Sequence, residues 1–183
     1  MKRITALLLI VCMMGGIALA DEWYPFGLTS SDTFETARAK VKAATGLEYH
    51  ETYTYSSAQP ANVKMDGVPV EMFLVNHPSG TEWRLTIVLK PELMEYDKLY
   101  DIYEMLVLQL GEPISVEPMT TSMSFSGTSD QVSPFANKAD FMTQAINNFP
   151  SDYTVTFPNV TYRITEGWST GTKLSLYFDC PKE

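Results

Sequence analysis

Apolar residues recur at helical spacing behind a polar stretch near the start of the chain. They are Phe34, Ala37, Val41 and Ala44. Asp32 and Glu35 stand three residues apart ahead of this pattern, an arrangement close to a capping box. Gly46 follows as a residue that commonly ends a helix. The pattern therefore predicts a helix over residues 32–45.

A wider apolar stripe predicts a second helix between Pro91 and Gly111. Its members are Leu99, Ile102, Tyr103, Leu106, Val107 and Leu110. Pro91 suits the first turn of a helix and Gly111 suits its end, while Pro113 prevents the helix from continuing.

A third helical pattern follows Ser133-Pro134, a dipeptide with the form of an N-cap and first turn. Its apolar positions are Phe135, Ala139, Met142, Ile146 and Phe149. Pro150 ends the pattern, so we expect a helix that begins at Ser133 and stops before residue 150.

Alternation of side-chain character predicts strands in the rest of the first half. Residues 48–55 alternate tyrosine and polar positions, which is typical of a half-buried strand. Residues 68–75 are apolar on both faces, as expected of a central strand. Residues 82–90 place Trp83 on an apolar face, and we expect them to pair with residues 68–75 as a hairpin. Asp66-Gly67 is expected to form a turn ahead of this hairpin.

Three alternating segments close the chain, at residues 152–157, 159–165 and 172–178. Their expected inward positions are Tyr153, Val155, Phe157, Val160, Tyr162, Ile164, Leu174, Leu176 and Phe178. Residues 114–125 show weaker strand character and run into small polar residues.

Helices that alternate with groups of antiparallel strands indicate an α+β fold. We expect an antiparallel sheet, or sheets, with two to three helices packed on one face. In both halves of the chain a helix ends at a glycine, Gly46 or Gly111, and a later hairpin turns at Gly80 or Gly171. This order indicates either a duplicated helix-plus-sheet unit, with an insertion in the second half, or a chance likeness of hairpin turns.

Residues 1–20 have the order of features of a secretory signal peptide. Lys2 and Arg3 precede an apolar run, and the small residues Ala18 and Ala20 frame a cleavage site. An uncleaved membrane anchor and a lipoprotein modified at Cys12 are the alternatives. We expect cleavage to leave residues 21–183 as a single α+β domain in the periplasm or outside the cell, with no stable membrane insertion.

The mature chain is strongly acidic. Loss of Lys2 and Arg3 leaves 11 of the 13 basic residues against 22 acidic ones, a net charge of −11. Such a chain repels phosphate backbones and anionic lipid surfaces, so nucleic acid is not expected as a partner. Cys180 becomes the single cysteine, and its alternation with Phe178 favours burial over pairing between chains.

Motifs of well-known catalytic and cofactor sites are absent from the sequence. The two histidines, His50 and His77, lack the spacing of a zinc motif, and no serine elbow or phosphate-binding glycine loop occurs. We therefore assign no catalytic residue, metal or cofactor. Glu51 and Glu71 could meet across strands as a carboxylate pair, and Asn159 begins a glycosylation sequon.

Aromatic residues supply the remaining candidates for binding. Trp168 lies in a turn rich in Gly, Ser and Thr, where it either covers the core or contacts a partner. Tyr49, Tyr53 and Tyr55 are expected to share one strand face; the core is the favoured place for that face, and Tyr53 and Tyr55 remain binding candidates. Trp83 is expected in the core.

These observations favour an exported, non-enzymatic binding or envelope-associated protein that holds a protein or a cell-envelope polymer. The alternative is an exported hydrolase with carboxylates assembled by folding, or a secreted enzyme inhibitor. The order of an aromatic-Phe-Gly-Leu opening, a helix and then strands resembles small exported bacterial proteins. No shared motif accompanies this resemblance, so it assigns no residue a role.

Overall fold

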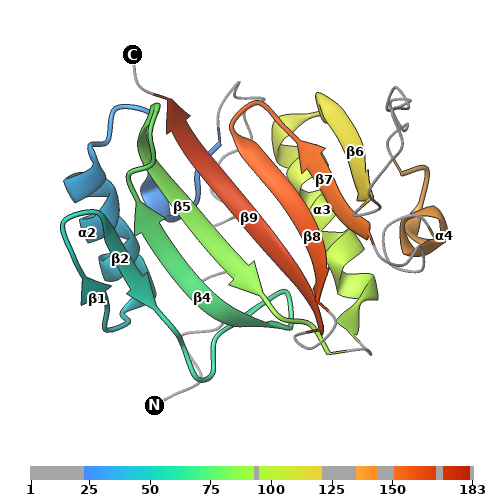
Figure 1. The fold of residues 1–183 in the computed structure, drawn as a ribbon, viewed down its shortest axis with the longest axis horizontal. Coiled ribbons are helices and arrows are strands. Elements are labelled where there is room, and N and C mark those ends of the chain that lie inside the picture. The colour runs from blue at the N-terminus through green and yellow to red at the C-terminus, as the bar shows by residue number, and fades with distance from the viewer. Residues whose placement is uncertain (1–22, 93–94, 121–134, 144–150, 168–170, 182–183) are drawn as a thin grey trace.

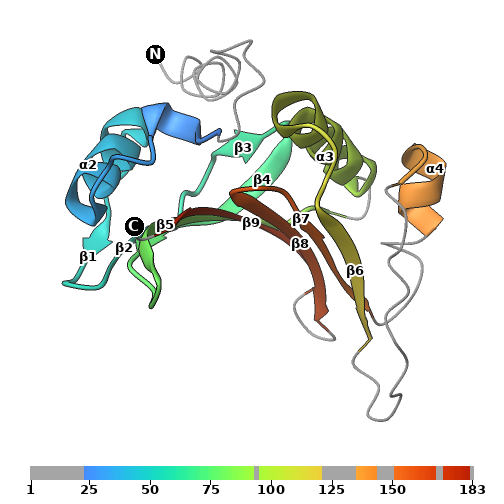
Figure 2. The same ribbon diagram turned by 90° about the horizontal axis from the view of Figure 1, so that it is seen from above.

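The computed structural model describes residues 23–92, 95–120, 135–143, 151–167 and 171–181. Within these ranges the chain forms a nine-stranded antiparallel sheet, and helices α2 (Phe34–Thr45) and α3 (Asp97–Leu110) pack on one of its faces (Figures 1 and 2). The predicted α+β fold is thereby confirmed. The strands are β1 (His50–Glu51), β2 (Tyr55–Ala58), β3 (Lys64–Met65), β4 (Val68–Asn76), β5 (Thr81–Leu89), β6 (Ser115–Thr120), β7 (Ser151–Thr156), β8 (Val160–Gly167) and β9 (Gly171–Pro181).

The strand order is symmetric about the centre of the sheet. It runs β1-β2-β4-β5-β9-β8-β7-β6, and the short β3 pairs only with β4. Each half starts with a helix, α2 or α3, and adds strands from one edge of the sheet inward (Figure 1). The last strands of the two halves, β5 and β9, pair with each other. This topology has the symmetry expected of the duplicated unit that the sequence left open.

Helix α2 begins at Phe34, two residues after the predicted start at residue 32. Its N-cap is Thr33, whose hydroxyl oxygen accepts a hydrogen bond from the backbone N–H of Thr36. Asp32 serves the preceding turn instead, where its carboxylate accepts hydrogen bonds from the backbone and hydroxyl of Thr29 and from Lys40. Gly46 ends the helix in the left-handed conformation, at φ 63°, as expected.

Helix α3 begins at Asp97 rather than at Pro91. A separate turn precedes it, in which the N–H of Glu95 donates to the carbonyl of Glu92, and the Glu95 carboxylate accepts from the N–H of Glu92. The predicted apolar stripe faces the sheet, with Leu99, Ile102 and Leu106 fully buried.

The third helical segment is shorter than predicted in the part that the structure describes. Helix α4 spans Lys138–Phe141, and its N-cap is Asn137, whose side-chain oxygen accepts from the N–H of Asp140. Phe141 is buried against Tyr100 of α3. The predicted cap Ser133 and the positions Ile146 and Phe149 lie outside the described residues.

The single strand predicted over residues 48–55 is wrong. The chain turns at residues 52–54, so β1 and β2 form a hairpin. Thr52 is the physical reason, because its hydroxyl oxygen accepts hydrogen bonds from the N–H groups of Thr54 and Tyr55. Such local side-chain bonds offer the backbone an alternative to a continuous strand.

The strand predictions for residues 68–75, 82–90, 152–157, 159–165 and 172–178 are confirmed, and their inward residues form the core. Strand β6 confirms the first part of the segment predicted over 114–125, and residues 121–125 lie outside the described residues. Trp83 on β5 is fully buried, and all nine inward positions expected of the last three strands are at most 2% exposed. Cys180 is 1% exposed, and its thiol donates to the carbonyl of Ser30. Burial of this cysteine is therefore confirmed.

The first described residues complete the core on the helical face of the sheet. The rings of Trp23 and Tyr24 meet Phe178 and Trp83 at 5.8 and 5.0 Å between centroids. Phe26 lies in the short helix η1 (Pro25–Gly27) and is 6% exposed. Its ring contacts that of Phe73 on β4, with 6.0 Å between the centroids. The aromatic residues Trp23, Tyr24 and Phe26 are thus structural.

Replacement of Phe26 by alanine tests this packing. We expect F26A to lower the free energy of unfolding by about 3–5 kcal/mol, because a buried aromatic ring is lost and a cavity remains. Leu108→Ala is the control, since Leu108 is 79% exposed, and it should change stability by less than about 0.5 kcal/mol. Urea unfolding of residues 21–183 measures both; equal midpoints would contradict the structural role.

The turn held by Asp32 predicts a pH dependence of stability. Burial disfavours the charged carboxylate, but hydrogen bonds from Lys40 and Thr29 outweigh burial and lower its pKa below the usual 3.8. The stabilisation is then complete above about pH 4 and is lost as the pH falls through the lowered value.

We expect Asp32→Asn to reduce stability at pH 7 by about 1.5–3 kcal/mol, as for other hydrogen bonds to buried charged groups. The deficit should shrink below pH 4. Glu35→Gln, at a side chain that is 66% exposed, should show neither effect. Urea unfolding from pH 2.5 to 7 decides, and a deficit that does not depend on pH would contradict the assignment.

Candidate functional site

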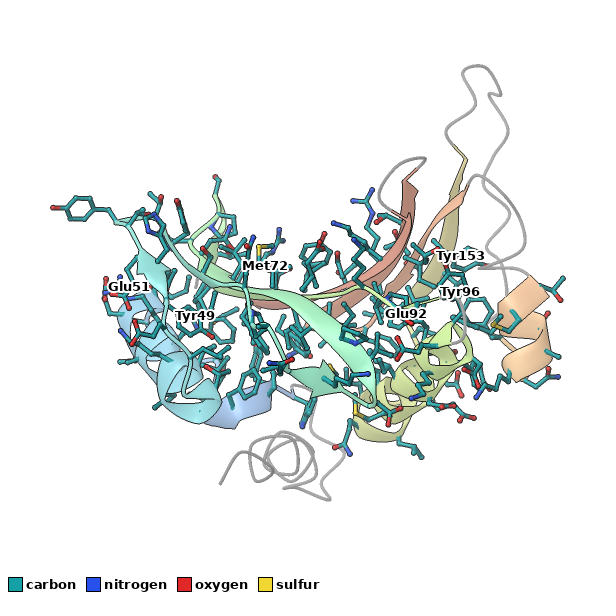
Figure 3. All side chains as sticks on the ribbon, turned by 90° about the horizontal axis from the view of Figure 1, so that it is seen from below. Tyr49, Glu51, Met72, Glu92, Tyr96 and Tyr153 are labelled. Carbon is teal, nitrogen blue, oxygen red and sulfur yellow. The ribbon has the colours of Figure 1, made fainter. Side chains whose placement is uncertain are left out.

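The sheet is arched, and its two faces differ in what covers them. Helices α2 and α3 lie on the convex side, while none of the described helices covers the concave side (Figures 2 and 3). Met72 points into the concavity, whereas Tyr49 and Tyr153 lie on the helical side (Figure 3). We call the concave side the open face.

Four polar side chains form one row across the open face. In-register pairs connect Tyr55 of β2 to Asn76 of β4, Asn76 to Arg84 of β5, and Arg84 to Asp179 of β9. Their strand neighbours, such as Val75 and Leu85, are buried on the helical side. Because side chains alternate along a strand, the four residues share the opposite face. We call Tyr55, Asn76, Arg84 and Asp179 the polar row.

A second row beside it is dominated by short hydroxyl side chains. Successive in-register pairs join Ser57, Leu74, Thr86, Tyr177, Thr161, Thr156 and Ser115, from β2 to β6. Further apolar side chains on this face are Met72 and Val88, which oppose each other on β4 and β5. The open face is therefore mainly polar and rich in hydrogen-bonding groups.

The centre of the polar row is an ion pair between Arg84 and Asp179. The guanidinium donates from Nε to Oδ1 and from Nη2 to Oδ2, the latter at 2.9 Å. It also lies over the ring of Tyr177, 5.5 Å from the centroid. The hydrogen bond to Asp179 raises the pKa of Arg84, so the guanidinium stays charged. Both side chains are half-buried, which holds the pair in one geometry.

A second ion pair lies on the same face, outside the polar row. Lys173 of β9 contacts Glu71 of β4 at 2.7 Å, and its exposure resembles that of the first pair. The carboxylate pair that the sequence suggested between Glu51 and Glu71 does not form. Glu51 instead binds Lys42 of α2, on the helical side.

A shallow cavity of about 330 Å³ opens between α2 and the β1–β2 hairpin. It is lined by Glu35, Arg38, Glu51, Thr52 and Tyr53. Arg38 lies over the ring of Phe34 and donates to the carboxylate of Glu35. The hydrogen bond from Lys42 lowers the pKa of Glu51, which is therefore a poor proton donor at neutral pH. The cavity thus holds two carboxylates, Glu35 and Glu51, and the second is paired with Lys42.

The three predicted binding residues have different outcomes. Tyr55 belongs to the polar row, and Tyr53 is fully exposed in the turn of the β1–β2 hairpin. Trp168 lies outside the described residues. The expectation that Tyr49, Tyr53 and Tyr55 share a core-facing side is wrong, because the turn separates them. Of the three, Tyr49 packs against the core, and its hydroxyl bonds to Thr45.

Other candidates from the sequence occupy structural positions. His77 lies in the β4–β5 turn, where its Nδ1 contacts the carbonyl of Glu82. The side-chain nitrogen of Asn159 donates to the carbonyl of Trp23, and the residue is 7% exposed, so the sequon is not available in the folded chain. In the described ranges no three His, Cys, Asp or Glu side chains gather as metal ligands would.

Among the residues with described structure, no helix has both the length and the apolar character needed to cross a membrane. Comparison with protein-family models, with curated proteins and with solved structures found no match for the chain. The candidate site therefore stands on its geometry alone.

Sequence reasoning missed the polar row because strand pairing is not encoded locally. Arg84 alternates with the buried Trp83 and Leu85, and Asp179 alternates with the buried Phe178 and Cys180. The sequence therefore indicates that β5 and β9 each carry a charged residue on the face opposite the core. It does not indicate that these two residues, 95 positions apart, lie in register and contact each other.

A double-mutant cycle tests the central ion pair. We expect R84A and D179A each to lower the free energy of unfolding, and the double variant to lose little more than either. The coupling should be about 1 kcal/mol, because the pair is bidentate but half-exposed. It should fall when salt is raised from low ionic strength to 1 M. Additive losses would show that the two side chains do not interact.

Proposed function

We propose that this chain is an exported binding protein that holds an extended partner, a protein or a polymer, against the open face of its sheet. One observation supports the proposal above the others: the concave side of the arch is polar, preorganised and not covered by a described helix. Antiparallel sheets can leave one face to solvent, and such a face then carries whatever function its side chains allow.

The side chains of the open face determine what kind of partner it suits. Ion pairs and hydroxyl groups outnumber the apolar residues Leu74, Met72 and Val88. A lipid or an amphipathic helix needs a continuous apolar lining, so neither is favoured. A partner that forms many hydrogen bonds to side chains fits the face better.

The β1–β2 hairpin adds a contact point at the rim of this surface. Tyr53 exposes its whole side chain, and Tyr55 lies in the next strand of the same hairpin. Exposed tyrosines combine a rigid ring with a hydroxyl group and are common in binding surfaces. We therefore retain both residues as binding residues.

Export is the second part of the proposal. Residues 1–20 have the order of features of a signal peptide, and Trp23, three residues after Ala20, packs against Phe178 in the core. Removal of residues 1–20 in a periplasmic or extracellular location would leave this packing intact. The intact mass of protein from its native host should match a chain that starts at Asp21, and a mass that includes Met1 would contradict export by cleavage.

Site-specific photocrosslinking tests the location of the binding surface. A benzophenone amino acid would replace Tyr53, Tyr55 or, as the control, Leu108 on the exposed side of α3. We expect irradiation in the native host to give adducts from positions 53 and 55. Electrophoresis, mass spectrometry and sugar analysis would then identify the partner as protein or polymer.

Position 108 is a demanding control, because its side chain is exposed and apolar. Adducts from position 108 with none from positions 53 and 55 would move the binding surface to the helical side. A pattern without adducts at any of the three positions would contradict a stable partner.

A further inference from the structure

We infer that the partner is an uncharged polysaccharide and that the polar row, together with Tyr177, is its binding subsite. This inference rests on the proposed function and names the ligand class of the same surface. Three features of the open face support it: the geometry of one ion pair, the arrangement of two tyrosines and the charges of the described residues.

The backbone of the inner strands is not available to a peptide ligand. Beta-strand addition requires a free sheet edge, yet β4, β5 and β9 each pair on both sides. The face also lacks the apolar groove that a helical peptide would require, and Arg84 is neutralised by Asp179, which disfavours acidic motifs. Recognition must therefore rely on side chains that exchange hydrogen bonds with a polar ligand.

The Arg84–Asp179 pair presents hydrogen-bond donors and acceptors side by side. Its two internal bonds use Nε and Nη2 of the guanidinium and leave the Nη1 donors. Each carboxylate oxygen accepts one of these bonds and keeps a second lone-pair position. Neighbouring sugar hydroxyls, each both donor and acceptor, match this alternation, and neither charged group would be left unpaired.

On the open face, tyrosine rings lie on both sides of Arg84. Tyr177 lies next to it on β9, under the guanidinium, and Tyr55 lies two strands away on β2. Sugar rings have apolar faces that stack on aromatic rings. Tyr55 is the ring for such stacking, whereas Tyr177 supports the guanidinium that covers one of its faces, and both tyrosine hydroxyls can bond to the sugar. From β2 to β9 the row spans three inter-strand gaps, about 14 Å, which suits several linked sugars.

Asn76 lies between the tyrosine and the ion pair and contributes a further polar group. Its side-chain oxygen is shielded from solvent and has no hydrogen-bond partner among the described residues. Asn76 therefore extends the polar lining between Tyr55 and Arg84, but its oxygen is not a contact point for a ligand.

Charge favours an uncharged ligand over an ionic polymer. Among the described residues of the open face, the ion pairs Arg84–Asp179 and Lys173–Glu71 are each neutral in sum, and Arg163 of β8 adds a further cation. The mature chain with its charge of −11 repels polyanions, and a polycation would prefer the exposed carboxylates elsewhere on the surface. Binding to a neutral polymer should therefore hardly depend on salt.

Affinity electrophoresis of residues 21–183 tests the inference. The gels would contain soluble β-1,3-glucan, xylan, mannan or galactan, or the neutral polysaccharide purified from the envelope of the native host. We expect at least one of them to retard the protein, at low salt and at 0.5 M salt alike. Asp179→Asn and Tyr55→Ala should each weaken that retardation at least about tenfold, since each removes a direct contact.

Glu71→Gln provides the matched control, because it alters an ion pair of similar exposure on the same face outside the polar row. Its affinity should stay within about twofold of the wild type, a change of less than half a kcal/mol. Circular dichroism of each variant confirms folding. Tyr177→Phe, which retains the ring, should bind better than Tyr177→Ala.

The outcomes separate this inference from the proposed function. Polypeptide adducts at positions 53 and 55, without retardation by any of the polysaccharides, would leave a binding protein and overturn the sugar ligand. The subsite would also be overturned if Asp179→Asn and Glu71→Gln weakened the retardation equally. Loss of the retardation in 0.5 M salt would overturn it as well. Retardation that responds only to the row variants would establish it.

Discussion

The pairing of β5 with β9 is the interaction on which the rest of the structure depends. It joins the last strands of the two halves through eight registered positions, from Thr81 opposite Pro181 to Leu89 opposite Leu174. Without this contact each half would be a smaller sheet with an exposed inner edge. The same register places Leu85 beside Phe178 on one face and Arg84 beside Asp179 on the other. Core and candidate site therefore arise from one set of backbone hydrogen bonds.

The segment that begins at Trp23 links these two sides of the sheet. Tyr24 packs on Trp83, and its hydroxyl donates to the backbone carbonyl of Asp179. Strand β9, which carries Asp179 of the polar row, is thus held by the segment that closes the core. A site on strands fixed in this way keeps its geometry better than a site on a loop. The aromatic segment therefore contributes to the candidate site indirectly, through the position of β9.

Much of the fold could be predicted from periodicity, because buried residues recur at the spacing of their element. The β4–β5 hairpin, the inward faces of the last three strands and the ends of two helices at Gly46 and Gly111 follow from this rule. The β1–β2 turn could not be predicted, since one hydroxyl, that of Thr52, overrides the alternation around it. Of the candidate site, the sequence yielded Tyr53 and Tyr55 but not the register that adds Arg84 and Asp179.

The ion pairs also bear on how an uncovered sheet face avoids association with a second copy. Dry stacking of two such faces would remove water from Arg84, Asp179, Lys173 and Glu71, and the desolvation of paired charges usually exceeds their attraction. A hydroxylated ligand replaces that water with hydrogen bonds of the same kind, so the penalty is far smaller. The face is thus unfavourable for apolar association and favourable for a hydrated polymer. That difference follows from the same two ion pairs, and it makes the polar lining a selective surface rather than a passive one.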